Sequence, residues 1–247
     1  MTQSVIICEG FHDRAFLKGW LEKLDWRSPS RSEGRTFCDS RGEAGRAGHF
    51  VLFRDRAGVR DYVRIAPVTG DTNVLPVAGD LLLEDKPLDV LICVLDSDQP
   101  RASADPVASR LQAFTKRLGP PGTSAMRPDG GSVRLELLVW CTAPSTHPRV
   151  GLPATHTLEL VAIDSIVAAY PARAAAVENF IAAQPLADPT RESAGRAKEH
   201  AWAYMAKWSG SRGCDEFYQG IWDDAQIAAA LEATLRSTSA WDVLASL

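Results

Sequence analysis

Residues Val90–Asp98 read Val-Leu-Ile-Cys-Val-Leu-Asp-Ser-Asp, an uninterrupted apolar run that ends in two carboxylates. The run is short, rich in β-branched residues and free of polar alternation, which is typical of a strand that helices cover on both faces. A second stretch of this kind, Val5–Glu9, stands near the start of the chain. In open α/β sheets the functional crevice lies beyond the carboxyl ends of the strands. The two stretches therefore predict an α/β fold in which Glu9, Asp96 and Asp98 meet at one edge of the sheet.

Three carboxylates at one edge point to a metal site. Like charges repel one another, and a hard cation such as Mg²⁺ or Mn²⁺, which prefers oxygen ligands, removes that cost. If residues 96–98 stay extended, Asp96 and Asp98 project to the same side and supply two ligands from one short segment. An Asx turn or a helix cap would account for the same two residues without a metal.

The order of these motifs resembles that of the Toprim domain, which occurs in topoisomerases, bacterial primases, small ribosomal RNA maturation nucleases and overcoming-lysogenisation-defect nucleases. The resemblance rests on Glu9, Gly10 and Asp13 after the first strand, and on residues 96–98 after a later one. It covers roughly residues 3–160. It implies a Rossmann-like, mainly parallel four-stranded sheet flanked by helices.

The same resemblance suggests further site residues. Glu159, in the first turn of a helix expected after the fourth strand, would be another metal ligand. Asp13 would be a neighbouring or second-metal carboxylate, and Lys198, on a later helix, would stabilise charge that develops on a phosphate. Simpler interpretations stay open, because Asp13 and Glu159 also suit the positive end of a helix dipole and Lys198 also suits a solvated helix surface.

Hydrophobic periodicity and turn residues predict the remaining elements. Helices are expected at 12–24, 71–84 and 106–118, and strands at 50–53, 62–68 and 133–140, with residues 56–59 closing a hairpin. Beyond residue 160 the chain is expected to be helical, over 165–170, 173–183, 191–208 and 224–235. The expected organisation is a Toprim domain over residues 1–160 and a C-terminal helical extension over 161–247 packed on it.

An arginine-rich insertion is expected at about residues 26–60, after the first helix. Arg27–Arg64 holds nine arginines against five acidic residues, an excess of four positive charges in a chain whose net charge is −4. Arginine suits phosphate contact. We therefore expect nucleic acid to bind at Arg54, Arg56, Arg60 and Arg64, although ordinary surface arginines would give the same pattern.

The composition fits a soluble globular protein, with 45% hydrophobic and 23% charged residues. The five cysteines form no Cys-x-x-Cys pair, which argues against a disulfide framework or a zinc knuckle. The chain opens directly into a strand and has no apolar run of membrane length, so a cytoplasmic protein of bacterial type without membrane contact is expected.

Together these features predict a Mg²⁺- or Mn²⁺-dependent nuclease acting on DNA or RNA, with Glu9 as metal ligand or general base. A topoisomerase or primase fits less well, because no tyrosine has a recognisable nucleophile context and no zinc or polymerase region is present. The alternative is a Toprim-like effector or binding subunit that acts with a partner, such as an ATPase in a bacterial defence system. A fold kept only for interaction, and a homo-oligomer, are also compatible with the sequence.

Overall fold

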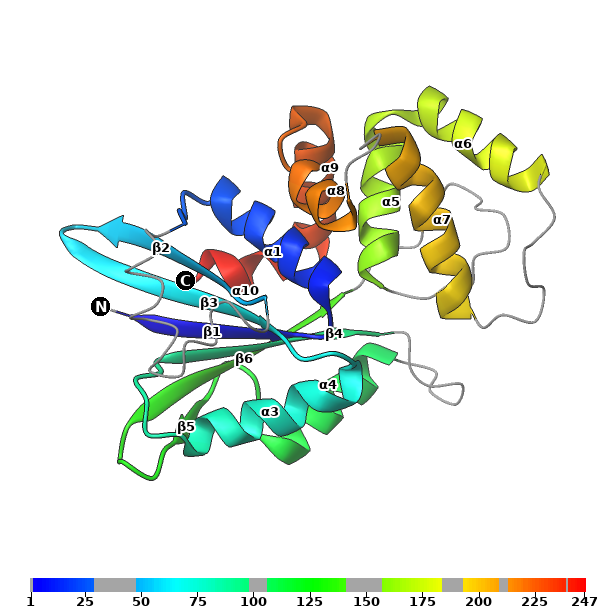
Figure 1. The fold of residues 1–247 in the computed structure, drawn as a ribbon. Coiled ribbons are helices and arrows are strands. Elements are labelled where there is room, and N and C mark those ends of the chain that lie inside the picture. Colours follow the sequence, from blue (N-terminus) through cyan, green and yellow to red (C-terminus); the bar gives the residue numbers. More distant parts are fainter. Residues whose placement is uncertain are drawn as a thin grey trace.

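A computed structural model describes residues 2–28, 48–97, 106–140, 157–183, 193–208, 213–238 and 240–247. Figure 1 shows an α/β fold in which helices flank a mixed six-stranded sheet. Within these ranges no helix is both long and apolar enough to span a membrane.

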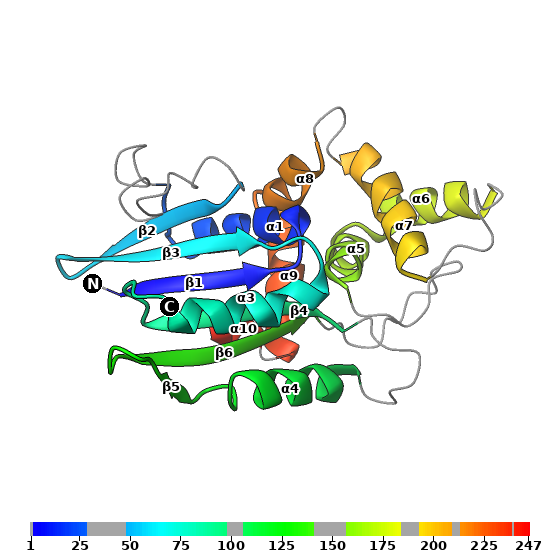
Figure 2. The same ribbon diagram turned by 60° about the horizontal axis from the view of Figure 1, so that its bottom comes forward.

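The sheet has the strand order β2-β3-β1-β4-β6-β5 (Figure 2). Its strands are β1 (Gln3–Cys8), β2 (Phe50–Arg56), β3 (Val59–Pro67), β4 (Val90–Asp96), β5 (Ser124–Met126) and β6 (Ser132–Trp140). The four central strands are parallel, and β2 and β5 add antiparallel at the two edges. The expected number of four strands was therefore wrong, because residues 50–56 of the expected insertion join the sheet and β5 is too short to show a period.

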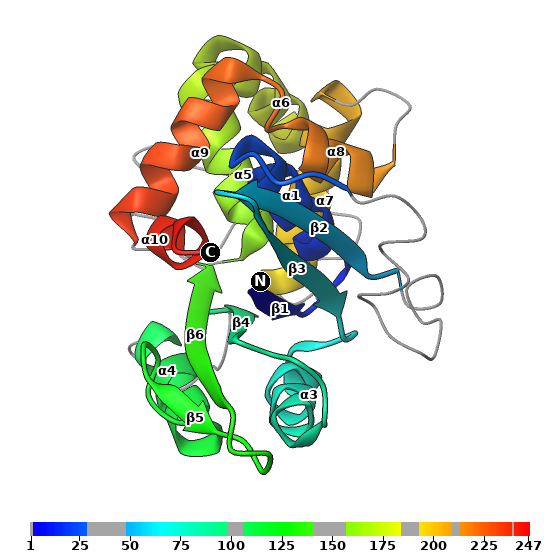
Figure 3. The same ribbon diagram turned by 90° about the vertical axis from the view of Figure 1, so that its left-hand side faces the viewer.

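Helices cover both faces of the sheet (Figure 3). Helix α1 (Phe11–Lys23) packs on one face, and α3 (Asp71–Leu83) and α4 (Pro106–Arg117) pack on the other. The side chains of β4 alternate between the two cores, since Ile92 and Val94 join the α1 side whereas Leu91 and Cys93 join the α3 side. Burial on both faces explains why the run is apolar without alternation.

The C-terminal part consists of α5 (Leu158–Ala169), α6 (Pro171–Ala183), α7 (Ser193–Trp208), α8 (Cys214–Gly220), α9 (Ala225–Ser237) and α10 (Ala240–Ala245). Helices α5 to α7 lie beyond the carboxyl ends of the strands, whereas α8 and α10 lie on the side of the sheet that carries α1 (Figure 1). One hydrophobic cluster joins Ile6 in the sheet, Trp20 in α1 and Leu247 at the end of the chain. The C-terminal helices therefore share a core with the sheet.

Helix α8 lies against α1 at a close approach that requires Gly19. A Cβ added at Gly19 would lie 2.6 Å from Cδ1 of Trp222 and 2.7 Å from the main-chain oxygen of Gln219. The indole Nε1 of Trp222 donates to the main-chain oxygen of Phe16 over 3.1 Å. The two segments are therefore fixed in one register.

The substitution Gly19→Ala is expected to lower the free energy of unfolding by about 1–3 kcal/mol, because crowding against Trp222 outweighs the better helix propensity of alanine. Urea denaturation monitored by tryptophan fluorescence measures this. The matched control is Gly220→Ala in α8, where an added Cβ meets no atom within 4 Å. Equal stability of Gly19→Ala and wild type would contradict the close approach.

Candidate metal centre

The acidic site lies where the order of the parallel strands reverses. Strand β1 pairs with β3 on one side and with β4 on the other. Helix α1 follows β1 on one face, and α4 follows β4 on the opposite face. Such a switch point opens a crevice at the carboxyl ends of the strands. Glu9 follows β1 and Asp96 ends β4, so the two predicted carboxylates flank this point.

Asp13 ties two sides of this edge together. Its Oδ2 accepts from the main-chain nitrogen of Gly10 over 3.0 Å, and its Oδ1 accepts from Nε1 of Trp140 over 2.6 Å. The carboxyl is buried, and this desolvation, with the negative charge of Glu159 as a further cause, raises the pKa of Asp13 from 3.8 to about 6 despite the bond from Trp140. Asp13 therefore positions the turn that carries Glu9 against the end of β6.

Helix α5 brings Glu159 to the same edge. The main-chain nitrogen of Leu158 donates to Oδ1 of Asp96 over 3.3 Å, which joins the start of α5 to the end of β4. Glu159 follows in the first turn, is buried, and has its Oε1 3.9 Å from Nδ1 of His12. The edge thus carries Glu9, Asp13, Asp96 and Glu159, from three segments of the chain.

Other side chains hold the end of β4 in place. Nε of Arg110 donates to the main-chain oxygen of Asp96 over 2.7 Å, and its Nη2 bonds Oδ2 of Asp71 over 2.9 Å. The buried hydroxyl of Ser97 donates to the main-chain oxygen of Trp140 over 3.0 Å. Sequence reasoning missed Arg110, although an arginine in the helix that follows an acidic strand end is a signal that could have indicated it.

Two buried hydroxyl groups at this edge lack hydrogen-bond partners among the described residues. Tyr218 of α8 is fully buried, and its ring stacks on His12 with centroids 4.9 Å apart. Burial, followed by the charges of Glu159 and Asp13, raises the pKa of Tyr218 well above its usual range. The second hydroxyl is Oγ1 of Thr157, directly before α5. Sequence reasoning missed Tyr218 because α8 was not predicted.

The donor chemistry fits a hard divalent cation, because the site presents carboxylate oxygens and hydroxyls. The thiol of Cys8 lies next to Glu9, but burial raises its pKa well above the usual range, which disfavours the thiolate that would bind a softer metal. Within the described ranges, no three His, Cys, Asp or Glu side chains are grouped closely enough to hold a metal ion. Asp98, the remaining predicted ligand, lies outside the described residues. The described carboxylates therefore form the surroundings of a cation site rather than a complete ligand set.

The predicted phosphate-binding residues lie elsewhere. Arg54, Arg56 and Arg60 belong to the half of the β2–β3 hairpin next to its turn, at the end of β3 opposite the acidic edge. Arg54 lies 4.6 Å over the ring of Trp26, and Arg60 forms an ion pair with Asp55 over 2.9 Å. Arg64 lies farther along β3.

Arg64 and Lys198 belong to two different elements. Arg64 is paired in the sheet with Val5 on one side and Val51 on the other, which places it midway along the strand. The backbone of Lys198 lies in α7, and its side chain is outside the described part of the chain. The structure therefore places four of the predicted carboxylates along one edge of the sheet but does not bring the predicted arginines to them.

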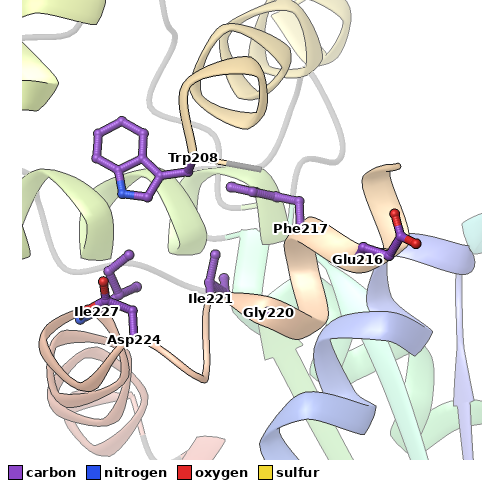
Figure 4. Close-up of a pocket in the computed structure, with 7 residues that line it drawn as sticks. All are labelled: Trp208, Glu216, Phe217, Gly220, Ile221, Asp224 and Ile227. Atoms are coloured by element: carbon purple, nitrogen blue, oxygen red, sulfur yellow. Dashed lines mark hydrogen bonds between the residues drawn. The ribbon is translucent and has the colours of Figure 1, made fainter. Parts of the chain in front are cut away.

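A hollow among the C-terminal helices is separate from this edge. It is lined by residues of α7, α8 and α9 and of the link between α8 and α9, namely Trp208, Glu216, Phe217, Gly220, Ile221, Asp224 and Ile227 (Figure 4). Its acidic groups serve the helices, since Asp224 caps α9 and accepts from the hydroxyl of Tyr170, and Glu216 accepts from the main chain of Gly213. These bonds make the hollow a weaker candidate than the acidic edge.

No protein-family model and no curated protein sequence matches this chain. The crystal structure of a hypothetical protein from Pyrococcus horikoshii is similar, with a TM-score of 0.53 and 16% sequence identity. The similarity covers 99% of this chain and 98% of that protein. At this identity the similarity shows the fold alone. Because it covers nearly the whole chain, it includes the C-terminal helices as well as the sheet.

Asp13 is expected to make the cation-free protein less stable as the pH rises. Because the pKa of about 6 in the folded state lies above the ordinary value of 3.8, the folded state holds this proton more tightly. The resulting stabilisation is complete below about pH 4 and is lost as the pH passes 6, a change of about 2–3 kcal/mol.

The measurement is the free energy of unfolding of wild type and Asp13→Asn between pH 4 and 7 in a chelator. The free energy of unfolding of wild type minus that of Asp13→Asn should decrease as the pH rises, because the amide of the variant cannot titrate. A difference that stays constant would show that Asp13 does not titrate in this range.

Proposed function

We propose that this chain is a Toprim-type nuclease that hydrolyses phosphodiester bonds of DNA or RNA with the help of Mg²⁺ or Mn²⁺. The observation that supports it best is the position of Glu9, Asp96 and Glu159 along one edge of the sheet, at its switch point. The Toprim assignment itself is supported by the order of the motifs, with Glu9 after the first strand and Asp96 at the end of a neighbouring parallel strand.

In this proposal Glu9, Asp96, Asp98 and Glu159 hold the cation. Once bound, the cation would neutralise the carboxylates and withdraw electron density from the scissile phosphate. Asp13 positions the turn that carries Glu9, and Arg110 fixes the main chain at Asp96. Glu9 can instead serve as general base toward water, and His12, in contact with Glu159, is placed to pass a proton to or from the edge.

The arginines of the β2–β3 hairpin remain part of the proposal as contacts to the nucleic acid backbone. The nine residues of β3 separate the hairpin turn from the acidic edge, a distance of roughly 30 Å at the rise of an extended strand. A strand of DNA or RNA that reached from Arg56 to Asp96 would therefore run along the β2–β3 side of the sheet. Lys198 would act at the phosphate itself.

The test replaces Asp96 by asparagine and Glu159 by glutamine, which removes the charges but keeps the shapes. Asp96→Asn retains an oxygen for the Leu158 nitrogen, so α5 stays attached. We expect Mn²⁺ affinity, measured by calorimetry, and cleavage of single-stranded and duplex DNA and RNA each to fall by roughly a hundredfold or more.

The matched control is Asp89→Asn at the opposite end of β4. Asp89 also accepts a main-chain nitrogen through its carboxylate, that of Gln3 over 2.7 Å, but it lies at the amino end of the strand. This variant should bind Mn²⁺ and cleave as wild type does. Mn²⁺ binding and cleavage that survive in Asp96→Asn would rule out the proposed site.

A second candidate, the effector or binding subunit that works with a partner such as an ATPase, is favoured by two exposed aromatic side chains. Phe180 on α6 is 61% exposed and Trp202 on α7 is 58% exposed. Aromatic residues are enriched at protein–protein interfaces relative to the rest of the surface. A stoichiometric partner that copurifies with wild type but not with Phe180→Ser/Trp202→Ser would support it, whereas metal-dependent cleavage by the isolated chain would support the nuclease.

A further inference from the structure

At the acidic edge, the buried hydroxyl of Tyr218 has no hydrogen-bond partner among the described residues that would explain its presence. The side chain is fully buried, and no described residue accepts or donates a hydrogen bond at its oxygen. Burying a hydroxyl without a partner costs free energy, and phenylalanine would fill the same space without that cost. A tyrosine at this position therefore indicates a partner beyond the residues that the structure describes.

The surroundings of the hydroxyl indicate which partner this is. The tyrosine ring stacks on His12, whose imidazole contacts Glu159, and the charges of Glu159, Asp13 and Asp96 all act on the phenol. Oγ1 of Thr157, buried at the start of α5 next to Leu158, is a second hydroxyl without a partner among the described residues. Two unpaired hydroxyls beside several carboxylates suit a hydrated cation, because water accepts from the hydroxyls and the cation offsets the charges.

We infer that Tyr218 belongs to the cation site and that its hydroxyl donates a hydrogen bond to water that enters with the divalent cation. The inference rests on the proposed function, and it adds a residue of the C-terminal helices to a site otherwise built at the carboxyl edge of the sheet. Because Tyr218 is fully buried, it contacts the hydrated cation rather than the nucleic acid. Tyr218 is thus a positioning residue for the cation and not a nucleophile.

The test is Tyr218→Phe, which keeps the ring on His12 and removes only the hydroxyl. In the chelator-treated protein the variant should have a Tm equal to or higher than that of wild type, since an unpaired buried hydroxyl has been removed. Its dissociation constant for Mn²⁺ alone, measured by calorimetry, should rise about tenfold, as is usual when a group that supports metal ligands is lost. The increase in Tm on adding Mn²⁺ should shrink accordingly.

The matched control is Tyr204→Phe. Tyr204 is also fully buried, but its hydroxyl donates to Oε1 of Glu178 over 2.6 Å. This variant should lose Tm without cation and keep the wild-type affinity for Mn²⁺. The two tyrosines are therefore expected to respond in opposite ways.

If Tyr218→Phe binds Mn²⁺ as wild type does, or loses Tm in chelator as Tyr204→Phe does, the role of Tyr218 is overturned. The carboxylate site is then still tested separately by Asp96→Asn. If wild type itself binds no Mn²⁺, the proposed function fails and the role of Tyr218 fails with it.

Discussion

The buried carboxylate of Asp13 is the link on which the acidic edge depends. Its two oxygens join the turn after β1 to Trp140 at the end of β6, across 127 positions of sequence. Trp140 in turn packs edge-to-face on Phe16 of α1, with centroids 5.3 Å apart. Charge-assisted hydrogen bonds from two N–H donors offset part of the cost of burying the carboxylate. Loss of this group would leave the indole nitrogen unpaired and would remove one of the bonds that hold the turn after β1.

The site is assembled by the C-terminal helices as much as by the sheet. Helix α5 contributes Glu159 and attaches to Asp96, and α8 contributes Tyr218 above His12. The position of α8 depends in turn on Gly19, where an added methyl group would meet Trp222 and the main chain of α8. A chain cut after residue 160 would therefore lose a wall of the site along with part of the core.

The sequence predicts the strands and their acidic ends because burial on both faces leaves a distinct apolar pattern, as in residues 90–96. It does not reveal strand order, which places Glu9 beside Asp96 through the pairing of β1 with β4. Short elements escaped prediction for a physical reason: α8 has seven residues and α10 has six, too few for a helical period to show. Tyr218 was missed with α8, and the hydrogen bond between Trp140 and Asp13 was not predicted because the two residues are remote in sequence.

In the proposed metal site, burial and repulsion of the acids connect stability with cation binding. The raised pKa of Asp13 reflects burial beside the negative charge of Glu159, so part of the folding free energy is spent on keeping these acids together in the absence of a cation. A cation that binds only the folded state would remove this repulsion, which would add to its affinity. Because it does not bind the unfolded state, it would also stabilise the fold. Asp13 and Glu159 are buried, and poor solvation of such carboxylates strengthens their attraction for a divalent ion.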